Sequence, residues 1–144
     1  MDRREEILAR LAVVAAGISG VVTAVRNSVG LSDDKRPAID ILDADEVSAP
    51  ALSSQGKGPQ LVTMTPEIYI MVAETPENLG PAINAIRASV IKAILEDTDL
   101  QNLTGDNGSI RYEGCATGLS RGRSMEGEMG ASIAFTYPFF LSEL

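Results

Sequence analysis

The chain of 144 residues contains no histidine, no tryptophan and a single cysteine, Cys115. The lack of histidine removes the usual proton shuttle at neutral pH and the commonest ligand of transition metals. One cysteine can form neither an internal disulfide nor a thiolate cluster. Much ordinary enzyme chemistry is thereby excluded, and Cys115 is expected to be a small, partly buried thiol in a strand.

Aromatic and basic residues are also scarce. With three Tyr and three Phe, the core must be built mostly from Ile, Val, Leu and Ala. Twelve basic against twenty acidic residues give a formal net charge of −8. Such a surface repels the phosphates of nucleic acid instead of binding them through counterion release, so sequence-specific DNA binding is not expected.

The apolar content is sufficient for one folded domain. Hydrophobic residues make up 44% of the chain and charged residues 22%, and this length is typical of a single domain, here residues 1–144. No apolar run reaches the length of a transmembrane helix, and Glu5, Glu6 and Arg10 interrupt the N-terminal one. We interpret that stretch as an amphipathic helix, not a signal peptide or membrane anchor, in a protein made in the cytoplasm.

Hydrophobic periodicity predicts the secondary structure. Residues 47–60 have two prolines, two glycines and no periodicity, which indicates a flexible loop. No βαβ unit recurs, so we predict an α+β fold in which two helices pack on one face of a mostly antiparallel sheet. The predicted order is helix (2–16), strands (21–27 and 37–45), loop (47–60), strand (61–74), helix (81–97) and strands (110–118 and 128–140).

An acidic cluster lies in the second predicted strand and just after it, at Asp40, Asp43, Asp45 and Glu46. Several carboxylates could hold a hard cation. Strand alternation, however, sends Asp43 and Asp45 to one side and Asp40 and Glu46 to the other, so they do not converge. A polar strand end is therefore favoured over a metal site.

No other motif supports catalysis. Residues 97–102 lack the ligands and glycine of a calcium loop, and residues 55–59 lack the spacing of a phosphate-binding loop. No nucleophile and base, and no pair of acids in an apolar pocket, can be assembled from the spacing. The sequence thus predicts no enzyme, no cofactor and no metal. Arg121 and Arg123 form a basic loop tip, which is either solvated or in contact with an acidic partner.

The order of the predicted elements resembles that of the tail terminator proteins of tailed bacteriophages. The similarity covers nearly the whole chain and carries no catalytic signature. After the N-terminal helix, it lies in the segments VRN, DDKRPAIDILDADE, PEIYIMVAE, GPAINAIRASVIKAIL and GASIAFTYPFF.

This resemblance implies a virion protein at the head–tail junction. Members form a ring, typically of six subunits, that ends polymerisation of the tail tube and offers a surface to the neck proteins. Such a ring binds the tail tube protein and the neck or head-completion proteins, needs no cofactor, contacts no membrane and lets genomic DNA pass without specific binding. We hypothesise that Asp43, Asp45 and Glu46 face its lumen or its axial surface, where negative charge keeps DNA from adhering.

Exposed apolar strips usually mark interfaces, and several residues are candidates for contacts between subunits or with partners. For Phe139 and Phe140, closure of the subunit's own core is an equal alternative. Two other functions stay open: a neck or head-completion protein, and a non-viral small-ligand or regulatory module. The candidate interface residues are Tyr69, Met71, Arg121, Arg123, Tyr137, Phe139 and Phe140.

Overall fold

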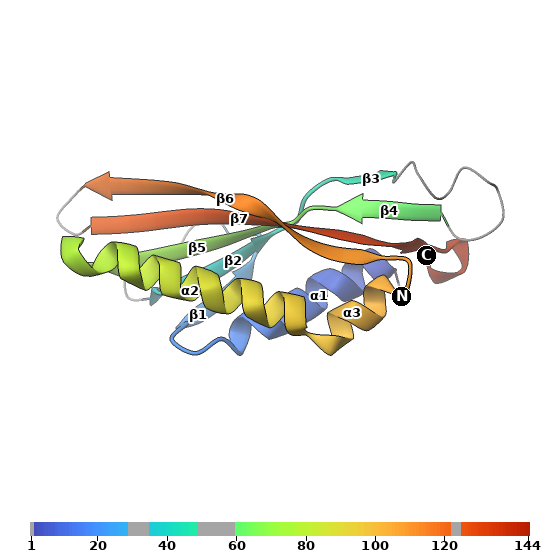
Figure 1. The fold of residues 1–144 in the computed structure, drawn as a ribbon, viewed down its shortest axis with the longest axis horizontal. Coiled ribbons are helices and arrows are strands. Elements are labelled where there is room, and N and C mark those ends of the chain that lie inside the picture. The colour runs from blue at the N-terminus through green and yellow to red at the C-terminus, as the bar shows by residue number, and fades with distance from the viewer. Residues whose placement is uncertain (1, 29–34, 49–59, 122–124) are drawn as a thin grey trace.

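Seven strands form one sheet in the computed structural model, which describes residues 2–28, 35–48, 60–121 and 125–144. Three α-helices accompany the sheet within these ranges, as predicted for an α+β domain (Figure 1). The elements are α1 (Arg3–Ala16), β1 (Thr23–Arg26), β2 (Ala38–Leu42), β3 (Glu46–Ser48), β4 (Gln60–Met64), β5 (Glu67–Glu74), α2 (Pro76–Glu96), α3 (Thr98–Thr104), β6 (Ser109–Arg121), β7 (Met125–Phe139) and the 3₁₀ turn η2 (Leu141–Glu143).

The long strand β7 is the axis of the sheet. It pairs with β6 on one side, and on its other side with β5 over its first half and with β4 over its second half. The sheet therefore forks into an arm β5-β2-β1 and an arm β4-β3. All these pairs are antiparallel except β1 with β2, as predicted for a mostly antiparallel sheet.

The helices cover one face of the sheet, where the core lies. Alternate residues of β7, such as Ile133 and Phe135, point to this face and are fully buried. They pack with Ile39 of β2, Leu8 of α1 and Ile83 of α2 in one cluster. The core is aliphatic except for Phe135 and Tyr137, as the scarcity of aromatic residues predicted.

Local signals explain where the helices begin. The Asp2 carboxylate caps α1 by accepting a hydrogen bond from the Arg4 amide, and Asp97 caps α3 by accepting one from Leu100. Pro76 occupies the first turn of α2, where no amide donor is needed. These features set the residues at which the helices begin.

Most element boundaries differ from the prediction by a few residues, and some differ by more. Residues 46–48 form β3 and Gln60 begins β4, so only 49–59 of the predicted loop remain, and these lie outside the described residues. The predicted strand 61–74 is two strands, broken before Pro66. Helix α2 begins at Pro76, so Pro81 lies inside it. A third helix, α3, occupies a segment that was predicted to be irregular.

A close approach joins α3 to β7. A Cβ atom on Gly108 would lie 2.1 Å from the Thr104 carbonyl oxygen and 2.3 Å from that of Thr136. Both atoms belong to the backbone and cannot rotate away, so only glycine fits here. This contact seats α3 against the second half of β7, and the same end of the domain carries η2 (Figure 1).

Candidate functional site

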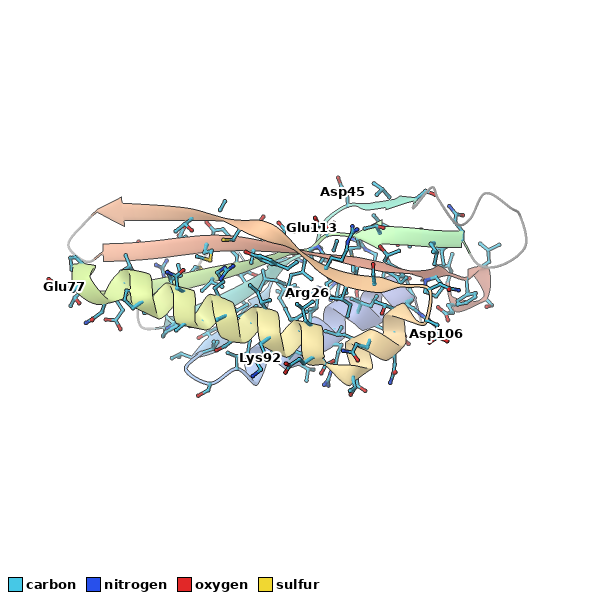
Figure 2. The ribbon with its side chains drawn as sticks, in the orientation of Figure 1. Arg26, Asp45, Glu77, Lys92, Asp106 and Glu113 are labelled. Atoms are coloured by element: carbon cyan, nitrogen blue, oxygen red, sulfur yellow. The ribbon has the colours of Figure 1, made fainter. Side chains whose placement is uncertain are left out.

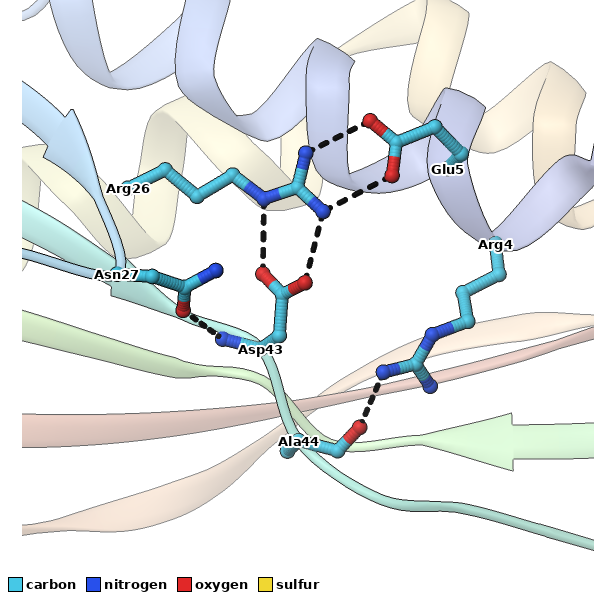
Figure 3. A network of polar contacts seen from close by, with 6 residues as sticks. All are labelled: Arg4, Glu5, Arg26, Asn27, Asp43 and Ala44. Atoms are coloured by element: carbon cyan, nitrogen blue, oxygen red, sulfur yellow. Dashed lines mark hydrogen bonds and ion pairs between the residues drawn. The ribbon is translucent and has the colours of Figure 1, made fainter.

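The acidic strand end is organised by an arginine from β1. Arg26 donates two hydrogen bonds to Asp43 (2.8 and 2.7 Å) and two to Glu5 of α1 (2.7 and 2.9 Å) (Figure 3). Asn27, in the left-handed region at φ 54°, accepts a hydrogen bond from the Asp43 amide. Asparagine tolerates that backbone conformation better than most residues. The cluster ties α1, β1 and the end of β2 together.

The charged groups in this cluster shift one another's pKa values. Hydrogen bonds from Arg26 hold the pKa of Asp43 below its usual range, against a smaller opposing effect of burial. The same guanidinium lowers the pKa of Glu5. Two doubly hydrogen-bonded carboxylates therefore stay ionised and paired, as charge-assisted bidentate contacts favour. Asp43 acts here as a structural residue of the domain.

The other two acids of the cluster differ in their surroundings. Glu46, at the start of β3, accepts a hydrogen bond from the hydroxyl of Tyr137, whose pKa is raised by burial and by that bond. Asp45 lies exposed between β2 and β3 (Figure 2). Because β2 ends at Leu42, the predicted strand alternation does not extend through 43–45. Whether these acids line a lumen stays a prediction.

Asp40 lies apart from that cluster, on the face of the sheet opposite the helices. It is buried, and its carboxylate accepts hydrogen bonds from the backbone amide and the hydroxyl of Ser28. Beside it, Tyr69 donates to Glu128 at 2.6 Å, which together with burial raises the pKa of Tyr69 to about 12. These residues, together with Arg36, Leu42 and Met71, line a cavity of about 210 Å³ with both polar and apolar walls.

The candidate interface residues do not share one surface. Met71 and Tyr137 are buried within the chain's own fold, which removes them from the exposed surface on which a contact could form. Tyr69 is half-buried and hydrogen-bonded. Phe139 and Phe140 are also half-buried. Phe139 packs against the core, as the alternative interpretation held.

Of the two arginines in the predicted basic loop tip, Arg121 is the last residue of β6. Arg123 falls outside the described residues. Its contact with an acidic partner stays a prediction.

Cys115 is exposed on β6, so the expectation of a partly buried thiol is wrong. A bulge between Tyr112 and Gly114 interrupts the register of β6. A hydrogen bond with Tyr112 and the nearby Arg87 guanidinium lower the pKa of the thiol. Arg87 also hydrogen-bonds the Tyr112 hydroxyl and lies 5.2 Å from the centre of its ring. These contacts brace α2 against β6.

One surface feature was missed by sequence reasoning. It is a groove of about 530 Å³ between the C-terminal halves of α1 and α2, lined by apolar residues such as Val13 and Val14 and by charged residues such as Lys92. The only available signal for the groove was the small residues on facing helices. Elsewhere, Leu141 and Leu144 at η2 are exposed.

The described residues lack several kinds of site. Among them, no group of three or more His, Cys, Asp or Glu side chains could hold a metal ion. Nor does the part of the chain that is described contain a helix long and apolar enough to cross a bilayer.

Comparison with known proteins does not assign the chain to a family. No protein-family model matches the sequence, and a search of curated proteins found no match either. The resemblance to tail terminators therefore stays a prediction from the residues.

Proposed function

We propose that this chain is a structural subunit of a phage tail terminator, which assembles as a hexameric ring at the head-proximal end of the tail tube. The observation that carries the proposal is the open sheet. In the described part of the chain, β1 pairs only with β2 and β6 pairs only with β7. Across the first half of β7 the order is β1-β2-β5-β7-β6, so these two strands are opposite edges.

Free edges favour association with further chains. An edge strand presents unpaired backbone N–H and C=O groups that can bind another strand. Here the two edges are unlike, since β1 has four residues and β6 has thirteen. Unlike edges on opposite sides suit a heterologous, head-to-tail contact, which closes into a ring when the rotation between subunits allows it. A ring subunit needs two such sides.

The ring would bind other virion proteins and no cofactor. Its axial surfaces would contact the tail tube protein on one side and the neck proteins on the other. The net charge of −8 would let DNA pass without adhering. A neck or head-completion protein is the second candidate, because the same open edges would allow assembly of the neighbouring ring on the head side of the terminator.

Native mass spectrometry and negative-stain electron microscopy of the purified chain test the assembly. We expect multiples of the 15.2 kDa subunit and annular particles. A chain that stays monomeric at high concentration, also in the presence of tail tubes, contradicts the proposal and favours a small-ligand or regulatory module.

A phage lacking this gene product separates the two virion roles. Overlong tails indicate a terminator, because tube growth no longer stops. Tails of normal length beside unjoined heads indicate a neck protein. Complementation with the intact chain, supplied from a plasmid, should restore whichever defect is seen and serves as the control.

A further inference from the structure

The second half of β6 is a sheet edge without the usual protection. After the bulge, the four successive residues 115–118 are all exposed. Their side chains alternate between the two faces of the sheet, so no other described element covers either face here. Natural edge strands are protected by charges, prolines or bulges. The first half of β6 has the bulge and the charged pair Arg111 and Glu113, whereas residues 115–118 contain neither a charge nor a proline.

Strand β1 is the free edge on the other side of the same part of the sheet (Figure 1). Within the described residues it pairs only with β2. It has four residues, the same number as the unprotected stretch of β6. Its outer side therefore offers backbone N–H and C=O groups over the length that residues 115–118 could pair with.

The topology sets the relative direction of these two edges. Strand β1 runs parallel to β2, and each further step from β2 to β5, β7 and β6 is antiparallel. In one chain β1 and β6 therefore point in opposite directions. Rotation about a ring axis keeps the direction of a strand along that axis, so β1 of the next copy also runs opposite to β6. Head-to-tail repetition thus creates an antiparallel pair, the slightly more stable arrangement.

The faces of the sheet select the register of this pair. Thr117 belongs to the helix-covered face, because its partner on β7, Met129, is part of the core. On β1, Ala24 packs against the same core. Placing Ala24 opposite Thr117 joins like face to like face, and all four residues of β1 then lie opposite residues 115–118. A shift by one residue would put every side chain of β1 on the wrong face.

The unprotected stretch also leaves room for the helix that accompanies β1. Helix α1 contacts β1 on the helix-covered face, so α1 of an incoming copy must pass close to β6. Residues 115–118 are Cys, Ala, Thr and Gly, all small. Thr117 is exposed although it lies on the helix-covered face, so α2 of its own chain leaves this position open.

We propose that β1 of one copy of this chain pairs in antiparallel orientation with residues 115–118 of β6 in the next copy, with Ala24 opposite Thr117. The inference rests on the ring assembly proposed above and names the strands that join its subunits. The sheets of neighbouring copies then form one continuous sheet around the ring.

Engineered cysteines test the pairing and its register. Residues directly opposite each other in an antiparallel pair have Cβ atoms about 4.5 to 5.5 Å apart, close enough for a disulfide after a small adjustment. In a Cys115→Ser background, the double variant Ala24→Cys with Thr117→Cys should give a ladder of covalent multimers after mild oxidation. The control pair Val25→Cys with Thr117→Cys places the thiols on opposite faces and should give no ladder. Each single variant should remain a monomer on a non-reducing gel.

Amide hydrogen exchange of the wild type tests the backbone contact without any substitution. Residues 23–26 and 115–118 should exchange more slowly in the concentrated, assembled chain than in the dilute chain, by roughly tenfold or more, because their outward amides gain hydrogen-bond partners. Strand β3 is the control, because it is also an edge of the described sheet and takes no part in the proposed contact. Its exchange should stay the same.

A charge on the edge should weaken the association. Ala116→Lys supplies the kind of protection that natural edge strands carry, and we expect it to weaken self-association by roughly tenfold. Ala85→Lys adds the same charge at an exposed position of α2 and should associate like the wild type. Circular dichroism checks that both variants are folded.

The outcomes separate this inference from the ring itself. Assembly of the wild type with unchanged exchange in both strands, or without a ladder from the Ala24 and Thr117 variant, overturns the strand pairing and leaves the ring standing. Covalent dimers from Thr117→Cys alone mean that two β6 strands pair with each other, which also overturns it. A ladder from the control pair overturns the register. A wild-type chain that remains monomeric at all concentrations overturns both the ring and the pairing.

Discussion

On β7, neighbouring residues belong to opposite faces of the sheet. Phe135 is fully buried beneath the helices, whereas the next residue, Thr136, hydrogen-bonds Thr63 of β4 at 2.9 Å on the second face. The same division runs through β5, where Ile70 joins the core and Tyr69 binds Glu128. The helix-covered face is held by apolar packing, whereas the second face combines polar pairs with a few buried apolar side chains such as Met71.

This difference between the two faces indicates which of them contributes more to the stability of the domain. Burial of aliphatic and aromatic side chains contributes about 1.5 to 3 kcal/mol per residue. A hydrogen bond between half-buried groups contributes a net of about 1 kcal/mol. The helix-covered face should therefore dominate the free energy of unfolding, while the second face sets local geometry. Paired substitutions on the two faces can test this directly.

The largest effect is expected for Phe135→Ala, compared with Thr136→Val on the opposite face. The first leaves a cavity in the core and should lower the free energy of unfolding by about 3 to 5 kcal/mol. The second removes one hydrogen bond and should cost about 1 kcal/mol or less. Urea denaturation followed by far-UV circular dichroism measures both. If both variants lost the same free energy of unfolding, the second face would contribute as much to stability as the helix-covered face, contrary to this prediction.

Glycines on the two faces give a second comparison. A Cβ on Gly127 would lie 3.0 Å from Cδ1 of the buried Leu79, so Gly127→Ala should cost about 1 to 2 kcal/mol through overpacking. A Cβ on Gly130 would meet only the mobile end of Glu67. Gly130→Ala should then change stability by less than about 0.5 kcal/mol. The same denaturation assay applies, and a reversed order would refute the packing argument.

Tyr69→Phe probes the polar pairs of the second face through pH. In the unfolded chain tyrosine titrates near pH 10, whereas the folded pKa of Tyr69 is about 12, because Glu128 accepts its proton in a hydrogen bond. The raised folded pKa means that this stabilisation is complete below about pH 10 and is lost as the pH rises towards 12.

The variant should therefore be less stable than the wild type by about 1 kcal/mol at pH 8, with a smaller difference at pH 11. Urea denaturation at both values provides the measurement. A difference that does not change between them would show that the hydroxyl acts only by filling space.

Strongly periodic segments were predictable from the sequence, and short or exposed ones were not. The apolar stripe of α1 was found at nearly its observed position, and those of α2 and β7 were found although both elements begin earlier than predicted. All three residues of β3 are exposed, so no alternation could reveal it. Helix α3 buries only Leu100 and Thr104, too few for a helical period. Its capping residue, Asp97, was the available signal.

The candidate site was less predictable because its contacts are distant in sequence. Arg26 and Asp43 are separated by 17 positions and meet only once β1 pairs in parallel with β2. Reading the acids as one polar strand end missed this pairing. The burial of Met71 and Tyr137 could not be predicted in the same way. Alternation along a strand assigns each residue to one face of the sheet, but it does not show whether other parts of the chain cover that face.

The smallest expected effects on stability concern Asp43, which is paired with Arg26, and Asp45, which is exposed. Asp43→Asn weakens the contact with Arg26 and should cost about 0.5 kcal/mol at pH 7, a value kept low because the pair is partly exposed to solvent. The lowered folded pKa of Asp43 means that its contribution is present above pH 3.8, its unshifted value, and disappears as the pH falls through the folded pKa. Wild type and variant should thus converge in acid.

Asp45→Asn should leave stability unchanged at either pH, because the residue is exposed and the fold of the subunit does not depend on it. That makes it the clean probe of the lumen hypothesis, whereas changes at Asp43 or Glu46 also disturb internal hydrogen bonds. If the acids face passing DNA, particles carrying Asp45→Asn should eject their genome more slowly while rings form normally. Ejection at the wild-type rate would place Asp45 away from the DNA path.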